Sequence, residues 1–180
     1  MQIIKYSWKH DSGGFEPSFL MSNGTRMRLF DNRIMMEIGE KSCTGYTEGG
    51  KRHECPNSAR IDYGYMCNEC RMNDDFFNCI QCTGAECINA RQRDSCMENN
   101  YFIYLASFDN ILKVGISFER RILERLIEQG ADFGAKIARV KDGKEVRCIE
   151  QDIRRHLGIT DRVVSKDKHK RLFWNGYFNI

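Results

Sequence analysis

The chain has 180 residues, 41% of them hydrophobic, which is enough for one ordinary domain or for two small ones with cores of their own. Its formal net charge of +3 is too small to indicate a nucleic-acid partner by itself, so any such argument depends on local clusters of charge. No apolar run is long enough to span a membrane and the first residues lack the apolar core of a signal peptide, so we expect a cytoplasmic protein without a membrane partner.

Residues 1–42 have the pattern of an antiparallel β segment. Asn23-Gly24 is a strong two-residue turn signal and predicts a hairpin. Strands are predicted at residues 3–8, 19–21, 26–29 and 34–38. We expect these strands to have a packing role. The alternative is a basic sheet face that meets phosphate, formed by Arg26, Arg28 and Arg33.

Eight of the nine cysteines lie between Cys43 and Cys96. Two CxxC pairs in this segment, without a secretory signal, favour metal binding over a disulfide framework. A zinc ion needs four ligands, and each pair can supply two of them from one side. The sequence therefore predicts two structural zinc ions in a module at residues 43–98. The predicted ligands are Cys43, Cys55, Cys67 and Cys70 for one ion, and Cys79, Cys82, Cys87 and Cys96 for the other.

Two alternatives stay open for this module. The two CxxC pairs could together hold one zinc ion as a single ribbon. His53 lies two residues before Cys55 and imidazole is also a zinc ligand, but four cysteines are already available, so we favour a surface or neighbouring role for His53. Sites with four cysteines are closed, which favours a scaffolding role over catalysis.

Residues 101–117 predict a β-hairpin. Two short runs rich in β-branched and aromatic residues flank the turn residues Phe108, Asp109 and Asn110. Gly115, within the second run, leaves room for another group to approach the sheet closely. A third strand is predicted at residues 135–140.

The helix predicted between this hairpin and the third strand carries two arginines. It follows Ser117 as its N-cap and ends at Gly130 as its C-cap. Arg121 and Arg125 lie four residues apart on one side of its apolar stripe, near the boundary between core and solvent. A phosphate-binding arginine would have to lie there, although boundary arginines also simply cover apolar surface.

A second helix is predicted from about Lys144 to Leu157. Its apolar stripe is formed by Val146, Ile149, Ile153 and Leu157. Glu150 lies beside this stripe at the edge of the core, where a carboxylate needs a metal ion, an arginine or a bound substrate. Glu145, in contrast, suits the first turn of a helix.

The segment 159–180 combines basic and aromatic residues. Its cations would contact phosphates while its aromatic residues stack on bases, as in single-strand binders. These aromatic residues are Phe173, Trp174, Tyr177 and Phe178. We favour the alternative for the aromatic residues, in which they dock the tail on the body of the protein. The candidate nucleic-acid contacts here are Lys168, Lys170 and Arg171.

The order of these parts resembles the GIY-YIG endonuclease superfamily. Phe102-Ile103-Tyr104 stands where the family has GIY, and Lys113-Val114-Gly115 stands where it has YIG, as in the lysine-type variant of some branches. The resemblance implies a domain at residues 99–158 with a three-stranded antiparallel sheet flanked by helices. It implies catalytic roles for Tyr104, Lys113, Arg121 or Arg125, and Glu150, with Mg²⁺ or Mn²⁺ bound by Glu150.

A second resemblance covers most of residues 43–165. The cysteine pattern, the sequences YLASF and KVGIS, and three short motifs are similar to one uncharacterised archaeal and bacterial family. That family joins a zinc-knuckle segment to a GIY-YIG-like domain. The three motifs are Glu128-Gln129-Gly130-Ala131, Ile149-Glu150 and Thr160-Asp161-Arg162. We therefore expect an α+β chain with an N-terminal antiparallel β segment, a zinc-binding insert and a small GIY-YIG-like domain.

Three hypotheses for the function follow. The first, which we favour, is a metal-dependent phosphodiesterase acting on DNA or RNA, in which Tyr104 helps to activate water, an arginine stabilises the phosphate charge and Glu150 holds the metal ion. The second is a zinc-stapled module that binds nucleic acid through Lys113, Arg121 and Arg125 without turnover. The third is a protein-interaction adaptor.

Overall fold

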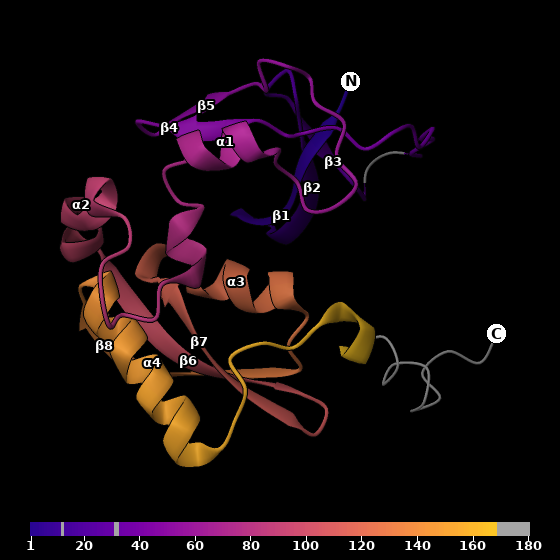
Figure 1. Ribbon diagram of the computed structural model, residues 1–180. Helices are drawn as coiled ribbons and strands as arrows, with labels where there is room; N and C mark the ends of the chain where they lie inside the picture. The colour runs from indigo at the N-terminus through magenta and orange to yellow at the C-terminus, as the bar shows by residue number, and fades with distance from the viewer. Residues whose placement is uncertain (12, 31–32, 169–180) are drawn as a thin grey trace. The chain divides into compact units, whose positions relative to one another are not determined.

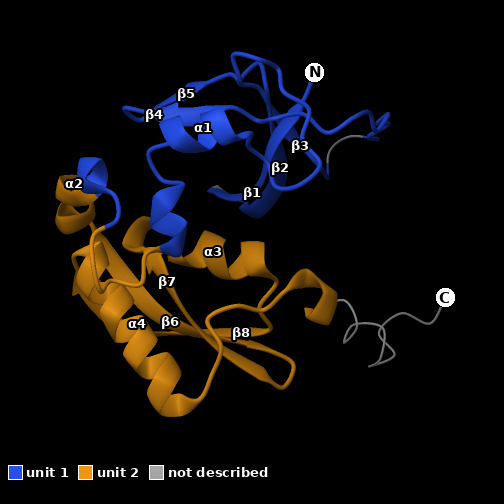
Figure 2. Cartoon of the chain, viewed as in Figure 1, with its two compact units in different colours: residues 1–81, 88–92 blue, residues 82–87, 93–180 orange. Residues whose placement is uncertain are grey.

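The computed structural model describes residues 1–11, 13–30 and 33–168, whose course is shown in Figure 1. They form two compact units, coloured separately in Figure 2: one from residues 1–81 with 88–92, and one from residues 82–87 with the described residues from 93 onward. Helices and antiparallel strands are both present, so the predicted α+β class is confirmed. None of the helices in the described part of the chain has the length and apolar character of a membrane span.

The first unit begins with a three-stranded antiparallel sheet of order β1-β2-β3, formed by β1 (Ile3–Asp11), β2 (Gly14–Met21) and β3 (Arg26–Arg28). The predicted Asn23-Gly24 turn joins β2 to β3. Gly24 has a φ of 81°, a left-handed conformation that favours glycine, and Asn23 Oδ1 accepts a hydrogen bond from Thr25 N at 3.1 Å.

The strand predicted at residues 34–38 is wrong. Residues 33–41 are all described and form neither helix nor strand, and Ile38 is 94% exposed. A strand persists only where a neighbouring strand takes up its backbone hydrogen bonds. Here strand-like pairing starts only at Ser42, in an isolated bridge with Arg60.

The rest of the first unit has little regular structure. It contains the short hairpin of β4 (Tyr46–Glu48) and β5 (Lys51–His53), helix α1 (Asn68–Asn73), and the 3₁₀ turns η1 (Asn78–Gln81) and η2 (Ala90–Gln92). Asp74, buried after α1, connects these pieces because its carboxylate accepts hydrogen bonds from Thr47 N and Phe76 N, both at 2.9 Å.

The second unit is built on an antiparallel sheet of order β7-β6-β8, which confirms the predicted hairpin and third strand. The strands are β6 (Asn100–Phe108), β7 (Ile111–Phe118) and β8 (Phe133–Lys141). The unit also contains α2 (Arg93–Glu98), the 3₁₀ turn η3 (Glu119–Arg121), α3 (Ile122–Gln129) and α4 (Gly143–Leu157). The turn between β6 and β7 is Asp109-Asn110, where Asp109 has a φ of 54°.

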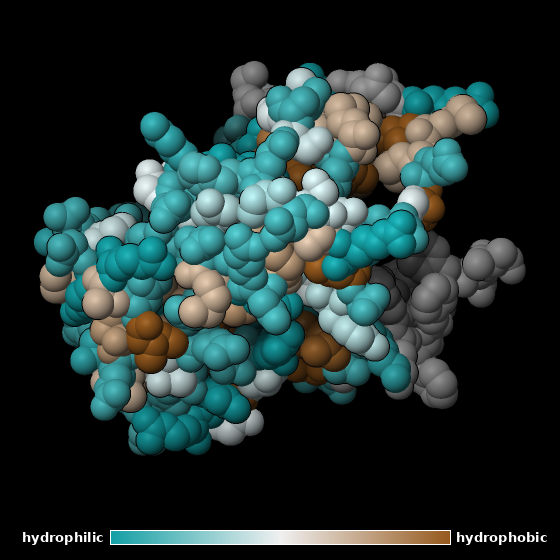
Figure 3. Space-filling view, turned by 45° about the horizontal axis from the view of Figure 1, so that its top comes forward, coloured by the Kyte–Doolittle hydropathy of each residue, from teal (hydrophilic) through white to brown (hydrophobic). Residues whose placement is uncertain are grey.

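The two longer helices of this unit cover opposite faces of its sheet. Side chains alternate between faces along a strand, so the neighbours Ile103 and Tyr104 on β6 point in opposite directions. Ile103 packs in a cluster with Val146 of α4, whereas Tyr104 packs in a cluster with Ile122 of α3. Two small cores result, one on each side of the sheet. On the face of the molecule shown in Figure 3, hydrophilic side chains predominate and hydrophobic ones form separate patches.

The ends of α3 agree only in part with the prediction. Gly130 is the C-cap, with a left-handed φ of 63°, as predicted. Ser117 is not the N-cap, because it still belongs to β7, its Oγ donates to Phe118 O at 3.2 Å, and η3 comes before the helix. As a result Arg121 lies at the start of α3 rather than within it.

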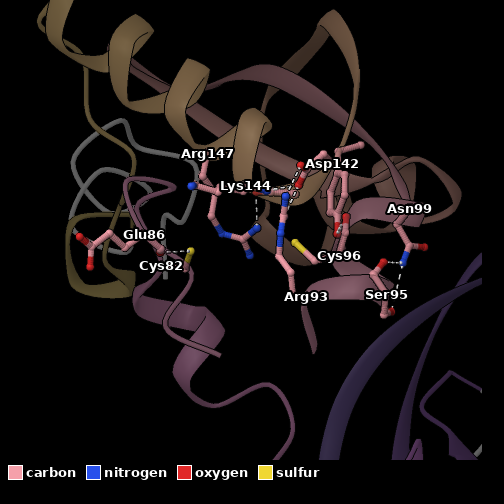
Figure 4. A network of polar contacts seen from close by, with 11 residues as sticks. Cys82, Glu86, Arg93, Ser95, Cys96, Asn99, Asp142, Lys144 and Arg147 are labelled. Atoms are coloured by element: carbon pink, nitrogen blue, oxygen red, sulfur yellow. Dashed lines mark hydrogen bonds and ion pairs between the residues drawn. The ribbon is translucent and has the colours of Figure 1, made fainter. Parts of the chain in front are cut away.

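The start of α4 is fixed by Asp142. Its carboxylate accepts a hydrogen bond from Lys144 N at 2.8 Å and pairs with both terminal nitrogens of Arg93 at 2.6 Å, as Figure 4 shows. Such a cap satisfies a backbone donor that the first turn of a helix leaves unpaired. Val146 and Ile149 pack on the sheet as predicted, but Leu157, the predicted last residue of the stripe, is exposed.

Candidate metal centre and active site

Four cysteines of the first unit form a metal-binding arrangement. The sulfur atoms of Cys43, Cys55, Cys67 and Cys70 all lie within 4.8 Å of one another. Two of them are buried, with Cys43 4% exposed and Cys70 0% exposed. Within residues 1–11, 13–30 and 33–168, no other group of three or more potential ligands comes this close. The first predicted set of four cysteines thus comes together and could hold a metal ion.

The backbone around these sulfurs suits thiolates. Cys43 Sγ accepts hydrogen bonds from Gly45 N at 3.4 Å and from Cys67 N at 3.2 Å, and Cys55 Sγ accepts one from Ala59 N at 3.5 Å. At Gly45 a Cβ would overlap the carbonyl oxygen of His53, so glycine is needed for this close approach. Amide dipoles aimed at sulfur favour its anionic form.

The pKa values of these thiols follow from burial and from those amides. Burial raises the pKa of Cys43 and the pKa of Cys70, whereas the Ala59 amide lowers the pKa of Cys55 to about 7. Buried thiolates need a cation beside them. Four sulfur ligands in a closed cluster fit a tetrahedral zinc ion. A bound zinc ion would crosslink this part of the chain, which has little regular structure.

His53 lies outside this cluster. Its ring stacks on that of Tyr46, with centroids 5.0 Å apart and planes at 17°. The two residues are cross-strand partners in the β4–β5 hairpin. This contact agrees with the favoured interpretation of His53 as a neighbour rather than a ligand.

The three cysteines of the second predicted set that share a unit do not form a cluster like the first within the described residues. Cys79 belongs to the first unit and accepts a hydrogen bond from Asn89 Nδ2 at 3.5 Å, whereas Cys82, Cys87 and Cys96 belong to the second. In that unit Cys82 Sγ donates to Glu86 O at 3.9 Å, and Cys96 lies against Gly143, where a Cβ would come within 2.5 Å of its sulfur. Figure 4 shows Cys82 and Cys96 in this region.

The arginines of the N-terminal sheet already have partners. Arg26 Nη1 donates to Ser7 Oγ at 3.1 Å, and Arg28 pairs with Glu16. These contacts agree with the packing role expected for the sheet.

In the second unit, Tyr104 lies at the centre of the α3 side of the sheet. Its side chain is 1% exposed, and its hydroxyl accepts a hydrogen bond from Gln129 Nε2 at 2.6 Å. Gly115 is its partner on β7, and a Cβ at Gly115 would lie 2.5 Å from Tyr104 Oη. The predicted close approach at Gly115 is therefore made by the ring of Tyr104.

Lys113 lies two residues before Gly115 on the same face of β7. It is 9% exposed, and its Nζ donates to Gln129 Oε1 at 2.9 Å. Burial lowers the pKa of Lys113 to about 8, and the nearby cations Arg125 and Lys168 add to this effect, while Glu150 and Asp161 oppose it. A lysine ammonium at the edge of β7 thus lies close to two further cations.

The two candidate arginines have different environments. Arg121 forms ion pairs with Glu124 at 3.2 Å and with Glu128 at 2.9 Å, so its charge is largely matched within α3. Arg125 is exposed and close enough to Lys113 to lower the pKa of that lysine. Arg125, rather than Arg121, is therefore the candidate arginine whose charge lowers the pKa of Lys113.

Glu150 is a half-buried carboxylate on α4. Burial, together with the charge of Asp161, raises the pKa of Glu150 to about 7, while Arg147, Lys113 and Arg154 act in the opposite direction. The predicted position of Glu150 at the edge of the core agrees with this burial. A carboxylate that is desolvated and also feels the charge of a second carboxylate gains from a divalent cation, for which oxygen ligands are suited.

Asp161 comes to this site through the chain that follows α4. Val114 N donates to Thr160 O at 2.9 Å, and Lys113 and Thr160 form a parallel bridge along the outer edge of β7. Sequence reasoning included Asp161 only in a motif and gave it no role. Hydrophobic periodicity does not predict an isolated bridge after a helix. The Thr160-Asp161-Arg162 motif was therefore the only sequence signal that pointed to Asp161.

The basic tail reaches the same region at its beginning. Lys168 Nζ donates to the backbone oxygen of Gln129 and lies 4.3 Å from the ring centroid of Phe108. Lys170, Arg171 and the aromatic residues predicted to stack on bases lie outside the described residues.

Comparison with known proteins places the chain in one family. It belongs to the family described as "Protein of unknown function (DUF2797)", which it matches over residues 33–173. The match includes the four-cysteine cluster, β6 to β8 and both longer helices of the second unit. No curated protein and no solved structure matches the chain.

Proposed function

We propose that this protein is a metal-dependent phosphodiesterase of GIY-YIG type that acts on DNA or RNA. The observation that carries the proposal is the half-buried Glu150, whose pKa responds to the charges of Asp161 and Lys113. Lys113 forms a bridge with Thr160 at the edge of β7, and the next residue, Asp161, contacts Gln151 and Arg154 of α4. Cations near a desolvated carboxylate, with a second and more exposed carboxylate in the same region, are an arrangement suited to a phosphate together with a divalent ion. The order of hairpin, arginine helix, third strand and glutamate helix supports the GIY-YIG resemblance.

Each residue of the site would have a distinct role in the reaction. Glu150, with Asp161 beside it, would hold Mg²⁺ or Mn²⁺, which when bound supplies positive charge to the reacting phosphate. Lys113 and Arg125 would contact the non-bridging oxygens and stabilise the charge that develops on them. Tyr104 would take part in proton transfer or donate a hydrogen bond to a reacting oxygen. Lys168, with Lys170 and Arg171 after it, would contact neighbouring phosphates.

The four-cysteine cluster would have a structural role in this proposal. Thiolates suit zinc, whereas the catalytic ion would need oxygen ligands and retained waters. The two metal sites would therefore be chemically distinct and would lie in different units of the chain.

A cleavage assay tests this function. Wild type, Glu150→Gln and the control Glu145→Gln are incubated with Mg²⁺ or Mn²⁺ and a mixture of single-stranded, duplex and branched DNA and RNA. We expect Glu150→Gln to abolish cleavage, because the amide keeps the shape but loses the charge that attracts the ion. Glu145, exposed on the first turn of α4, should be replaceable without loss.

The outcomes separate the hypotheses. Equal cleavage by wild type and Glu150→Gln would contradict the proposed site. Salt-dependent binding without cleavage of any substrate would favour the binding module. In that case Glu150 would position one of the phosphate-binding cations, and Lys113 is the candidate whose charge acts on Glu150.

A further inference from the structure

Gln129 occupies a fixed position at the end of α3. It is the last residue of the helix, and the next residue, Gly130, closes it in a left-handed conformation with its N–H donating to Ile127 O at 2.9 Å. A side chain at such a cap leaves the helix in a defined direction. Gln129 is half-buried, between Tyr104 on β6 and Lys113 on β7.

The orientation of the Gln129 amide follows from its partners. A lysine ammonium has only donors, so the group that faces Lys113 must be the carbonyl oxygen Oε1. The amide nitrogen Nε2 therefore faces Tyr104, and since Nε2 is only a donor, the Tyr104 oxygen must accept. The phenolic hydrogen of Tyr104 is not used in this chain of hydrogen bonds and can be donated to another group.

The backbone of Gln129 holds a second cation. Its carbonyl oxygen, at the C-terminal end of α3, accepts a hydrogen bond from Lys168 Nζ. Carbonyl groups at this end of a helix carry partial negative charge and favour cations. Each ammonium has three donors, so one bond to Gln129 positions Lys113 and Lys168 without using up their donors.

We propose that Gln129 is a positioning residue, which holds the Lys113 ammonium for phosphate and directs the Tyr104 hydroxyl hydrogen toward a reacting oxygen. The inference deepens the proposed function and depends on it for the role of the two groups. The arrangement itself depends only on the two side-chain hydrogen bonds. The other charged groups that influence Lys113 are Arg125 on α3, Glu150 on α4, and Asp161 and Lys168 in the chain after α4.

Two substitutions separate positioning from mere packing. Gln129→Glu places a carboxylate against Lys113 and stabilises its charged form, whereas Gln129→Met removes the acceptor and destabilises that form. The amine reacts with acetic anhydride only when it is neutral. Acylation of Lys113 near pH 7, about one unit below its pKa, should therefore slow in Gln129→Glu and quicken in Gln129→Met. At this pH only a small fraction of the amine is neutral, so a shift of half a pKa unit corresponds to a change of roughly threefold in either direction.

The acylation experiment needs no substrate. The intact protein is acylated in buffer free of Mg²⁺ and then digested, and the acylation rate of each lysine is measured by mass spectrometry of the peptides. Lys141, which is exposed on β8, is the internal control. Opposite changes at Lys113 with an unchanged Lys141 are the expected result. No change at Lys113, or a change in the same direction in both variants, would overturn the positioning role. A general loosening of the fold would produce the latter.

A double-mutant cycle tests the second contact in the cleavage assay. Gln129→Glu cannot donate to Tyr104, so it should slow cleavage by about tenfold or more where Tyr104 participates in proton transfer. In a Tyr104→Phe background the same change should slow cleavage by a smaller factor than in wild type, because that background already lacks the contact with Tyr104 and only the effect on Lys113 remains. Independent, additive losses would contradict the link. If wild type cleaves nothing, the proposed function fails, while the acylation result still decides whether Gln129 positions Lys113.

Discussion

Gly115 and Tyr104 are cross-strand partners, and the hydroxyl of Tyr104 lies where a side chain at position 115 would begin. A Cβ built on Gly115 would be 2.5 Å from Tyr104 Oη and 2.6 Å from Cζ, both shorter than any ordinary contact. The ring can take this place only because residue 115 has no side chain. The same relationship brings the Tyr104 hydroxyl within reach of Gln129.

Gly115→Ala should therefore destabilise the second unit. The fully buried ring has no free space to move into, so we expect a loss of about 1–3 kcal/mol in the free energy of unfolding, typical of overpacked cores. Urea unfolding measures this loss. Gly39→Ala is the matched control, because nothing lies within 4 Å of its Cβ position. A Gly115→Ala protein as stable as the control would contradict the packing described for Tyr104.

The cysteine cluster predicts the metal content of the protein. Purified protein should hold zinc bound by Cys43, Cys55, Cys67 and Cys70, and Cys70→Ser should lose about one zinc ion per chain, together with much of the stability of the first unit. Elemental analysis measures this loss. Cys148→Ser, on α4, is the control and should keep the zinc of this cluster.

The total zinc count also tests the second predicted set. One ion per chain in wild type would agree with the single cluster found in the described residues. Two ions, one of them absent from Cys82→Ser, would support two separate four-cysteine sites. Zinc retained in Cys70→Ser at the wild-type level would contradict the four-cysteine site of the first unit.

The two arginines of the α3 region should contribute unequally to nucleic-acid binding. Arg125→Met removes an exposed charge near Lys113, whereas Arg121→Met removes one that already pairs with Glu124 and Glu128. The slope of log affinity against log salt should decrease by about 0.7 to 0.9 for every phosphate that a variant no longer neutralises. Fluorescence anisotropy with a labelled oligonucleotide measures both slopes. A larger decrease in slope for Arg121→Met than for Arg125→Met would contradict the assignment of Arg125 as the main phosphate contact of the two.

The shifted pKa values predict how stability depends on pH. The pKa of Glu150 rises from 4.5 to about 7 on folding, so between these pH values the folded chain keeps a proton that the unfolded chain releases. The free energy of unfolding should then fall as the pH rises through this window. The pKa of Lys113 falls from 10.5 to about 8, so between about pH 8 and 10.5 the unfolded chain holds the extra proton and stability should rise with pH.

Substitutions assign each part of this profile. Relative to wild type, Glu150→Gln should become progressively more stable from pH 4.5 to 7, and Lys113→Met should lose the rise above about pH 8. Urea unfolding at a series of pH values measures the differences. Differences that do not vary with pH would contradict the burial of these two groups.

Local patterns in the sequence were sufficient for the sheet and the two longer helices of the second unit. The strands, the Asp109 turn, the Gly130 cap and the stripe from Val146 to Ile153 are each encoded within a few residues, so periodicity and turn chemistry identified them. The same patterns were misleading at residues 34–38, where an apolar run had no partner strand. At Ser117 the strand continued past a residue with good capping chemistry.

The site was only partly predictable, because its contacts join distant segments. The spacing of CxxC indicated thiolate pairs, but which four cysteines meet depends on how the loops fold, and one of the two predicted sets comes together. The link from Lys113 through Gln129 to Tyr104 joins β7, the end of α3 and β6. No local pattern encodes such a link, so Gln129 received no role from the sequence.

Anomalous diffraction from crystals of the protein with Mn²⁺ and a phosphorothioate oligonucleotide that resists cleavage tests the central claim most directly. We predict a manganese peak in contact with the Glu150 carboxylate and with a phosphate oxygen, and a second oxygen of that phosphate in contact with Lys113 Nζ. The peak should be absent in crystals of Glu150→Gln. An oligonucleotide bound away from Lys113, or manganese bound without Glu150, would contradict a phosphodiesterase site at the edge of β7.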